Sequence, residues 1–127
     1  MLRTFLMLAA FFGFTGVALG AFAAHGLKNR LTPEYLAIFQ TGVLYQLIHA
    51  LAIFGVAILA TQIQGRLVSY AGIAFTLGIL LFSGSLYVLT LTGVSKLGII
   101  TPIGGLCFLI GWFILGWTAW RLGVDTL

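Results

Sequence analysis

Four long uncharged segments alternate along the chain with short segments that hold the charged residues. The uncharged segments run from Thr4 to Leu27, from Tyr35 to Gly65, from Leu67 to Ser95 and from Leu97 to Trp120. A helix crosses a hydrocarbon core of about 30 Å with roughly 20 residues, so each segment is long enough to span a membrane. The pattern predicts an all-α fold, an integral membrane four-helix transmembrane bundle.

We expect a single transmembrane domain over residues 1–127, with helices at about 2–24, 33–61, 67–91 and 102–121. Thr32 and Thr101 each precede a proline, and a threonine cap followed by proline suits the first turn of a helix. The second helix would be roughly 43 Å long at about 1.5 Å per residue, which exceeds the hydrocarbon thickness. It is therefore either tilted or bent near Gly42 with its first two turns in the headgroup layer, and we favour the bend.

Four spans place both ends of the chain on the same side of the membrane. The basic residues divide evenly between Arg3, Arg66 and Arg121 on that side and Lys28, Arg30 and Lys96 on the other. The positive-inside rule counts such residues near the spans, and here it gives no preference. The free amino terminus adds one charge to the terminal side, so we expect both termini in the cytoplasm.

Small residues recur along the first helix, at Ala9, Gly13, Gly16, Gly20 and Ala24. Spacings of three and four place them on one face, and Gly16 to Gly20 is a GxxxG step that permits close helix packing. The face packs against another helix of the same chain or against a second copy, and we favour the first. The start of the chain also resembles a secretory signal peptide, but the long apolar stretch and its packing glycines favour a retained helix.

The composition narrows the class of protein further. Hydrophobic residues make up 61% of the chain and charged residues 6%, with a mean hydropathy of +1.19, whereas soluble domains contain about 25% charged residues. The net charge of +4 comes from scattered residues, so no basic face indicates nucleic-acid binding. We expect membrane lipids as partners, together with a second copy or a larger membrane complex, and no nucleic acid.

Polar residues inside the predicted spans are costly in lipid, which makes them the best functional candidates. We assign an intramembrane polar network to the second and third helices, comprising Tyr45, Gln46, His49, Ser83, Ser85 and Tyr87. His49 lies near the middle of its helix. We predict that the two polar stripes face each other and that His49 hydrogen-bonds Ser83 or Tyr87, because an unpaired imidazole in hydrocarbon is costly.

Three roles are open for His49: a hydrogen-bonded link between helices, which we favour, a proton-handling or substrate-contacting group, and a metal or haem ligand. Of the two histidines, His25 lies at the end of the first helix, too far along the bundle to share one iron with His49 of the same chain. We therefore expect no metal and no cofactor, with a haem or quinone held within an oligomer as a weaker alternative.

The remaining polar candidates lie at the predicted membrane interface: His25, Glu34 and Thr101. We expect His25 to cap the first helix or to pair with Glu34. The two carboxylates, Glu34 and Asp125, lie outside the spans, and Cys107 has no base beside it in the sequence. Acid–base pairs, metal clusters and phosphate loops all need groups that this chain lacks, so we predict no catalytic residue and no enzymatic activity.

Several motifs together resemble the domain of unknown function 423 family of YgdD-like small membrane proteins. They are Gly20-Ala21-Phe22-Ala23-Ala24-His25-Gly26-Leu27, Thr41-Gly42 with Tyr45-Gln46 and His49-Ala50-Leu51-Ala52, Phe82-Ser83-Gly84-Ser85-Leu86-Tyr87, and Thr101-Pro102-Ile103-Gly104-Gly105. The resemblance implies a four-span protein of the plasma membrane. It links some members to membrane integrity or stress tolerance and supplies no established biochemical activity.

These observations lead to one functional expectation and one alternative. The expectation is a non-enzymatic small membrane protein of the inner or plasma membrane that acts by association with itself, with lipids or with a larger complex. The alternative is a proton-coupled transporter or channel subunit in which His49 titrates. Four helices leave little room for a translocation path, so the alternative requires an oligomer.

Overall fold

The computed structural model describes residues 1–122, and its regular structure in that range is helical. The elements are α1 (Leu2–His25), α2 (Pro33–Gln62), α3 (Leu67–Gly78), the π-helical turn η1 (Ile79–Ser83), α4 (Gly84–Thr92), the 3₁₀ turn η2 (Ser95–Ile99) and α5 (Thr101–Arg121). Within residues 1–122, four stretches are long and apolar enough to cross a membrane: Leu2–His25, Pro33–Gln62, Leu67–Thr92 and Ser95–Arg121. The predicted fold class, an all-α bundle of four membrane-spanning helices, is confirmed.

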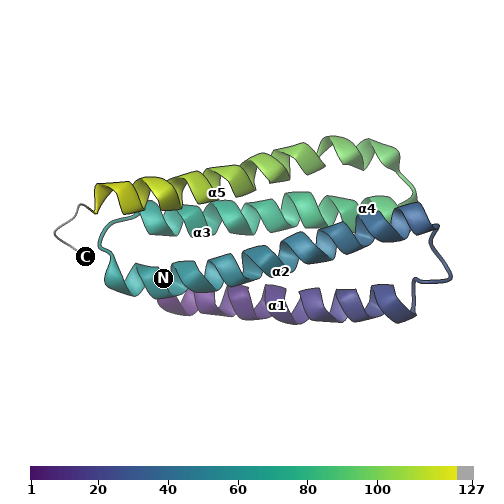
Figure 1. Ribbon diagram of the computed structural model, residues 1–127, viewed down its shortest axis with the longest axis horizontal. Helices are drawn as coiled ribbons and strands as arrows, with labels where there is room; N and C mark the ends of the chain where they lie inside the picture. Colours follow the sequence, from purple (N-terminus) through teal and green to yellow (C-terminus); the bar gives the residue numbers. More distant parts are fainter. Residues whose placement is uncertain (123–127) are drawn as a thin grey trace.

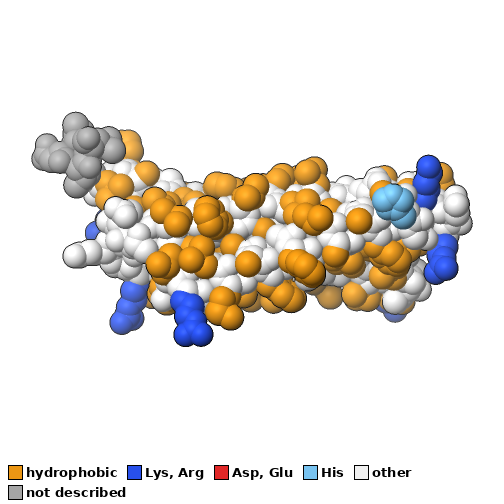
Figure 2. Space-filling model, turned by 90° about the horizontal axis from the view of Figure 1, so that it is seen from below, with side chains coloured by type: hydrophobic (Ala, Val, Ile, Leu, Met, Phe, Trp, Pro, Cys, Tyr) orange, Lys and Arg blue, Asp and Glu red, His pale blue; other side chains and the backbone are white. Residues whose placement is uncertain are grey.

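The four spans lie side by side, with α1 and α5 on opposite sides of the central α2 and α3/α4 (Figure 1). α1 packs along α2, and α5 packs along α3. The start of α1 and the end of α5 lie at the same end of the molecule (Figure 1). Basic side chains lie at both ends, whereas hydrophobic side chains cover the surface between them on the face shown (Figure 2). This distribution suits a bundle whose middle is surrounded by lipid.

α2 begins as its sequence predicts, with the Thr32 side chain accepting a hydrogen bond from the Tyr35 amide at 3.1 Å. The predicted bend near Gly42 is wrong. α2 is one continuous helix through that residue and runs obliquely across the bundle (Figure 1), which is the tilted alternative. Gly42 is a packing position and not a hinge, because the Tyr87 ring lies where a side chain would be.

The third span is not the uninterrupted α-helix that the sequence predicts. The turn η1 separates α3 from α4 with π-helical hydrogen bonds, and such turns widen a helix locally. Gly104 of α5 packs directly on the backbone of this turn, since an added Cβ would overlap the main chain of Leu81 and Phe82. The π turn and Gly104 together bring the fourth span onto the third at backbone distance.

We predict that Gly104→Ala destabilises the bundle while Gly105→Ala does not. A methyl group at Gly104 meets main chain that cannot rotate away, and overpacking costs about 1–3 kcal/mol. A methyl group at Gly105 finds only ordinary contact with the Phe82 ring, 3.9 Å away, and alanine favours a helix by about 1 kcal/mol over glycine. Thermal unfolding of both variants in detergent tests this, and equal midpoints would contradict the backbone contact.

Candidate functional site

Gln46 is the centre of the polar contacts inside the bundle, and its side chain is only 3% exposed. Its amide nitrogen donates to the Phe12 carbonyl at 2.9 Å and to the Thr15 hydroxyl at 2.8 Å, both on α1. Its amide oxygen accepts from the Tyr87 hydroxyl of α4 at 2.7 Å. Because a carbonyl can only accept, the Phe12 contact fixes which end of the amide faces α1. One side chain of α2 thereby links three spans.

Ser83 adds a second link between the same central helices. Its hydroxyl is fully buried and donates to the Gly42 carbonyl at 2.7 Å. Tyr87 lies one helical turn after Ser83, and its ring packs on Gly42. The centre of this ring lies 4.9 Å from the centre of the Phe39 ring. The predicted facing of the second and third spans is therefore present at Gly42 and Gln46.

His49 connects α2 to a different span, α5. Its Nδ1 lies 2.7 Å from the Tyr45 carbonyl, and the Trp112 indole nitrogen donates to its Nε2 at 3.0 Å. A carbonyl only accepts and an indole N–H only donates, so the contacts assign the hydrogen to Nδ1 and leave Nε2 as the acceptor. The imidazole also stacks on the Phe108 ring at 3.6 Å. Both ring nitrogens are thus occupied by contacts within the chain.

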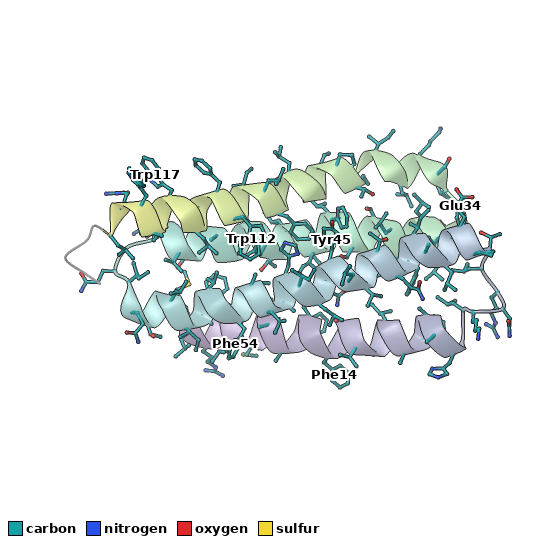
Figure 3. The ribbon with its side chains drawn as sticks, viewed as in Figure 1. Phe14, Glu34, Tyr45, Phe54, Trp112 and Trp117 are labelled. Atoms are coloured by element: carbon teal, nitrogen blue, oxygen red, sulfur yellow. The ribbon has the colours of Figure 1, made fainter. Side chains whose placement is uncertain are left out.

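The predicted bond from His49 to Ser83 or Tyr87 is wrong. Those two hydroxyls bond Gly42 and Gln46 instead, and His49 faces Trp112, a partner that the sequence reasoning did not assign. The available signal was the depth of Trp112, which lies well inside its span while Trp117 lies near the end (Figure 3). An indole N–H in the middle of a span finds no acceptor in lipid and needs one from the protein at its own depth.

Thr15 was also missed, for a different reason. Its hydroxyl already donates to the Phe11 carbonyl at 2.8 Å, as threonine commonly does in helices. The hydroxyl of such a threonine can bond a carbonyl of its own helix. The sequence therefore gives no sign that it also accepts a hydrogen bond from another span.

The Tyr45 side chain belongs to the aromatic packing, and only its backbone carbonyl takes part in the hydrogen bonds, through His49. Its ring lies 4.8 Å from Phe82 and 6.2 Å from Phe108, centre to centre, in the layer between α2 and α5 where Trp112 also lies (Figure 3). No hydrogen bond of its hydroxyl is found within residues 1–122, so the predicted polar role of Tyr45 is not observed there.

Ser85 joins α4 to α5 near the loop end of the bundle. Its hydroxyl donates to the Phe82 carbonyl at 2.8 Å and lies 2.6 Å from the Thr101 hydroxyl. Thr101 was expected to cap the last helix, and that expectation is wrong. α5 begins at Thr101 itself, with Ile100 at the cap position and no side-chain cap, because the threonine hydroxyl is turned toward Ser85.

The other interfacial candidates lie at the loop end. His25 is exposed, and its Nδ1 lies 2.9 Å from the Ala21 carbonyl in the last turn of α1, which is the capping alternative. Glu34 lies in the first turn of α2, where a carboxylate favours the helix dipole, and the described residues contain no ion pair between it and His25. Asp125 lies outside the described residues.

The glycine stripe of α1 packs mostly within the chain. A Cβ at Gly16 would lie 2.6 Å from the Leu47 side chain, and one at Gly20 would lie 3.3 Å from Val43, both on α2. Gly13 differs, because a Cβ there would meet nothing within 4 Å. Residues 1–122 hold no cluster of three or more His, Cys, Asp or Glu side chains that could bind a metal.

Comparison with known proteins gives the family. The chain matches the family described as "Protein of unknown function (DUF423)" over residues 19–105, which confirms the resemblance carried by the motifs. That range includes Gln46, His49, Ser83, Ser85 and Tyr87, whereas Thr15 and Trp112 fall outside it. No solved structure matches the chain.

Relatives from several bacteria align over most of the chain. The UPF0382 membrane protein YwdK of Bacillus subtilis strain 168 is 45% identical over 115 residues, which cover 90% of this chain and 94% of that protein. The UPF0382 membrane protein of Haemophilus influenzae is 42% identical over 121 residues, or 95% and 97% of the two chains. The UPF0382 inner membrane protein YgdD of Escherichia coli K12 is 40% identical over 113 residues, or 89% and 86%.

We predict that Tyr87→Phe destabilises the bundle and that Tyr45→Phe leaves it unchanged. The first change removes the hydrogen bond to Gln46, and single side-chain hydrogen bonds in membrane proteins contribute about 0.6 to 1.7 kcal/mol. The second removes a hydroxyl without an observed partner. Unfolding in mixed detergent micelles measures both free energies. If Tyr45→Phe lowers the free energy of unfolding as much as Tyr87→Phe does, the assigned network is incorrect.

Proposed function

The chain belongs to the DUF423 family of small membrane proteins, and from this premise we propose that it is a non-enzymatic polytopic protein acting through association at its outer surface. The associating partner is lipid, a second copy or a larger membrane complex, and the role is to maintain membrane integrity or stress tolerance. One observation carries the proposal: the polar side chains of the bundle interior bond one another and the backbone.

Gln46 and His49 provide the strongest support. They are the two buried residues whose side chains have the most hydrogen-bonding capacity, and each joins α2 to a neighbouring span. In residues 1–122 no buried side-chain nitrogen or oxygen lacks a hydrogen-bond partner. A substrate or a proton path through the bundle would need Gln46 or His49 to exchange partners, and each such exchange would break a link between helices.

The outer surface supplies the rest of the argument. α1 and α5 are the least buried spans, and their outward side chains are large and apolar, including Phe14, Phe113 and Trp120. Phe14 points away from the bundle (Figure 3). A surface of this kind is suited to contact lipid or another membrane protein.

The same proposal includes the plasma membrane and cytoplasmic termini. The Escherichia coli relative is named an inner membrane protein, which supports the location. The start of α1 and the end of α5 share one end of the bundle (Figure 1), which fits both termini on one side of the membrane. Arg3, Arg66 and Arg121 belong to that side, and the proposal takes them as the cytoplasmic charges, since positive charge favours the cytoplasm.

A proton-coupled transporter is the main competing function, and it depends on His49. The Trp112 indole can only donate, so a proton arriving at Nε2 would break the link from α2 to α5. In the described part of the chain the indole nitrogen has no hydrogen-bond partner other than Nε2, and the other aromatic rings nearest the imidazole are those of Tyr45, Phe75 and Phe108.

We predict that vesicles containing the protein take up protons no faster than vesicles without it. The test is a pH jump across vesicles of Escherichia coli polar lipid that enclose a pH-sensitive dye, with His49→Gln as the matched variant. The variant should behave as the wild type does. The proposal would be overturned if proton uptake were faster than in empty vesicles and this excess disappeared in a folded His49→Gln protein. That result would establish proton transport through His49.

Association itself can be measured by native mass spectrometry of the protein extracted gently from its own membrane. We expect masses of one or more chains with retained phospholipid or a retained partner subunit. A bare single chain under conditions that preserve lipid on other membrane proteins would contradict the proposal.

A further inference from the structure

An apolar groove runs along the outside of the bundle between α1 and α2, with a volume of about 710 Å³. Small residues of α1 form its floor and larger residues of both helices form its walls. The lining is Leu6, Ala9, Ala10, Gly13, Val17, Leu47, Ala50, Leu51 and Phe54. Phe54 extends from α2 toward α1 (Figure 3). The groove remains open because Gly13 has no side chain and its position borders empty space.

The length of the groove matches one leaflet of a bilayer. From Leu6 to Val17 is eleven residues of helix, or roughly 16 Å at about 1.5 Å per residue. Half of a hydrocarbon core is about 15 Å. Leu6 lies one turn from the start of α1, so the groove begins near the membrane surface at the terminal side and ends near the bilayer centre.

The lining of the groove ends at Val17, and the α1 residues beyond it pack on α2. Gly20 lies against Val43, and Ala23 is fully buried between the helices. A helix from a second copy would run through both leaflets and would need a groove along the whole of α1. A groove confined to one leaflet instead fits an extended chain anchored at the membrane surface.

A positive charge lies at the surface end of the groove. Arg3 precedes Leu6 by three residues and Ala10 by seven, spacings that place it on the same face of α1. Its side chain is exposed, and a long arginine side chain at this depth reaches the headgroup layer. The guanidinium binds phosphate through paired hydrogen bonds.

We propose that the groove between α1 and α2 holds one acyl chain of an anionic phospholipid, with the lipid phosphate at Arg3. This site specifies which lipid associates with the outer surface of the bundle. The inference therefore rests on the proposed function. The apolar lining selects the chain, and the arginine favours a headgroup with net negative charge. The lipid then lies in the leaflet of the terminal side.

The test counts lipids on the intact protein by native mass spectrometry after reconstitution with equal amounts of phosphatidylglycerol and phosphatidylethanolamine. We expect the wild type to retain one phosphatidylglycerol per chain. Gly13→Leu fills the groove floor and should abolish retention. Arg3→Gln leaves the groove open and should weaken phosphatidylglycerol retention about fivefold, the effect of one basic residue at an anionic surface.

Two matched variants control for non-specific effects. Gly116→Leu places the same side chain at another glycine with nothing within 4 Å, on α5 away from the groove. Arg121→Gln removes a basic residue at the terminal end of α5. Both should retain lipid as the wild type does, and circular dichroism with size-exclusion chromatography shows that each variant is folded.

Three results would overturn the site. They are equal loss of lipid in Gly116→Leu and Gly13→Leu, equal retention of phosphatidylethanolamine and phosphatidylglycerol, and a wild-type dimer that Gly13→Leu converts to a monomer, which would place a second copy in the groove. The last result would leave the proposed function standing. Proton transport by the wild type would overturn that function without changing the lipid count.

Discussion

Within a hydrocarbon solvent, a polar side chain must find its hydrogen-bond partner inside the protein, and Gln46 meets this constraint for three spans at once. Its amide bonds the Phe12 carbonyl and the Thr15 hydroxyl of α1 and accepts from Tyr87 of α4. Since lipid offers no replacement partners, moving any of these helices would expose an unpaired group. The position of α2 between its neighbours, and with it the groove on the α1 side, depends on this residue.

The packing of α5 follows from a different contact. His49 accepts from Trp112 and stacks on Phe108, while Gly104 lies on the main chain of the π turn at Phe82. Gln46 and His49 are three residues apart on α2 and bond different spans, Gln46 bonding α1 and α4 and His49 bonding α5. The interior of the bundle is therefore occupied by links between helices, and the outer surface is left for interaction with lipid or protein.

The sequence predicts the spans well and the partners poorly, for a physical reason. The charged residues mark the ends of the helices, because lipid tolerates charge only at the ends of a span. Thr32 and Pro33 also mark the start of α2. The polar stripes of the second and third spans indicate which of their faces meet, but the last span has no such stripe, so its sequence does not show which face points inward. The depth of His49 could be read from the sequence, but the rotation of α5 that brings Trp112 to it could not. The π turn depends on a close backbone contact at Gly104, which leaves no periodic signal.

The central claim is that the buried polar groups hold the helices together, and the hydrogen position on His49 tests it most directly. Solid-state NMR of the protein with ¹⁵N-labelled histidine in lipid bilayers at neutral pH distinguishes the two ring nitrogens. The account predicts a hydrogen on Nδ1, a bare Nε2, and magnetisation transfer from the Trp112 indole N–H to Nε2. A hydrogen on Nε2, or no transfer from Trp112, would contradict the link between α2 and α5.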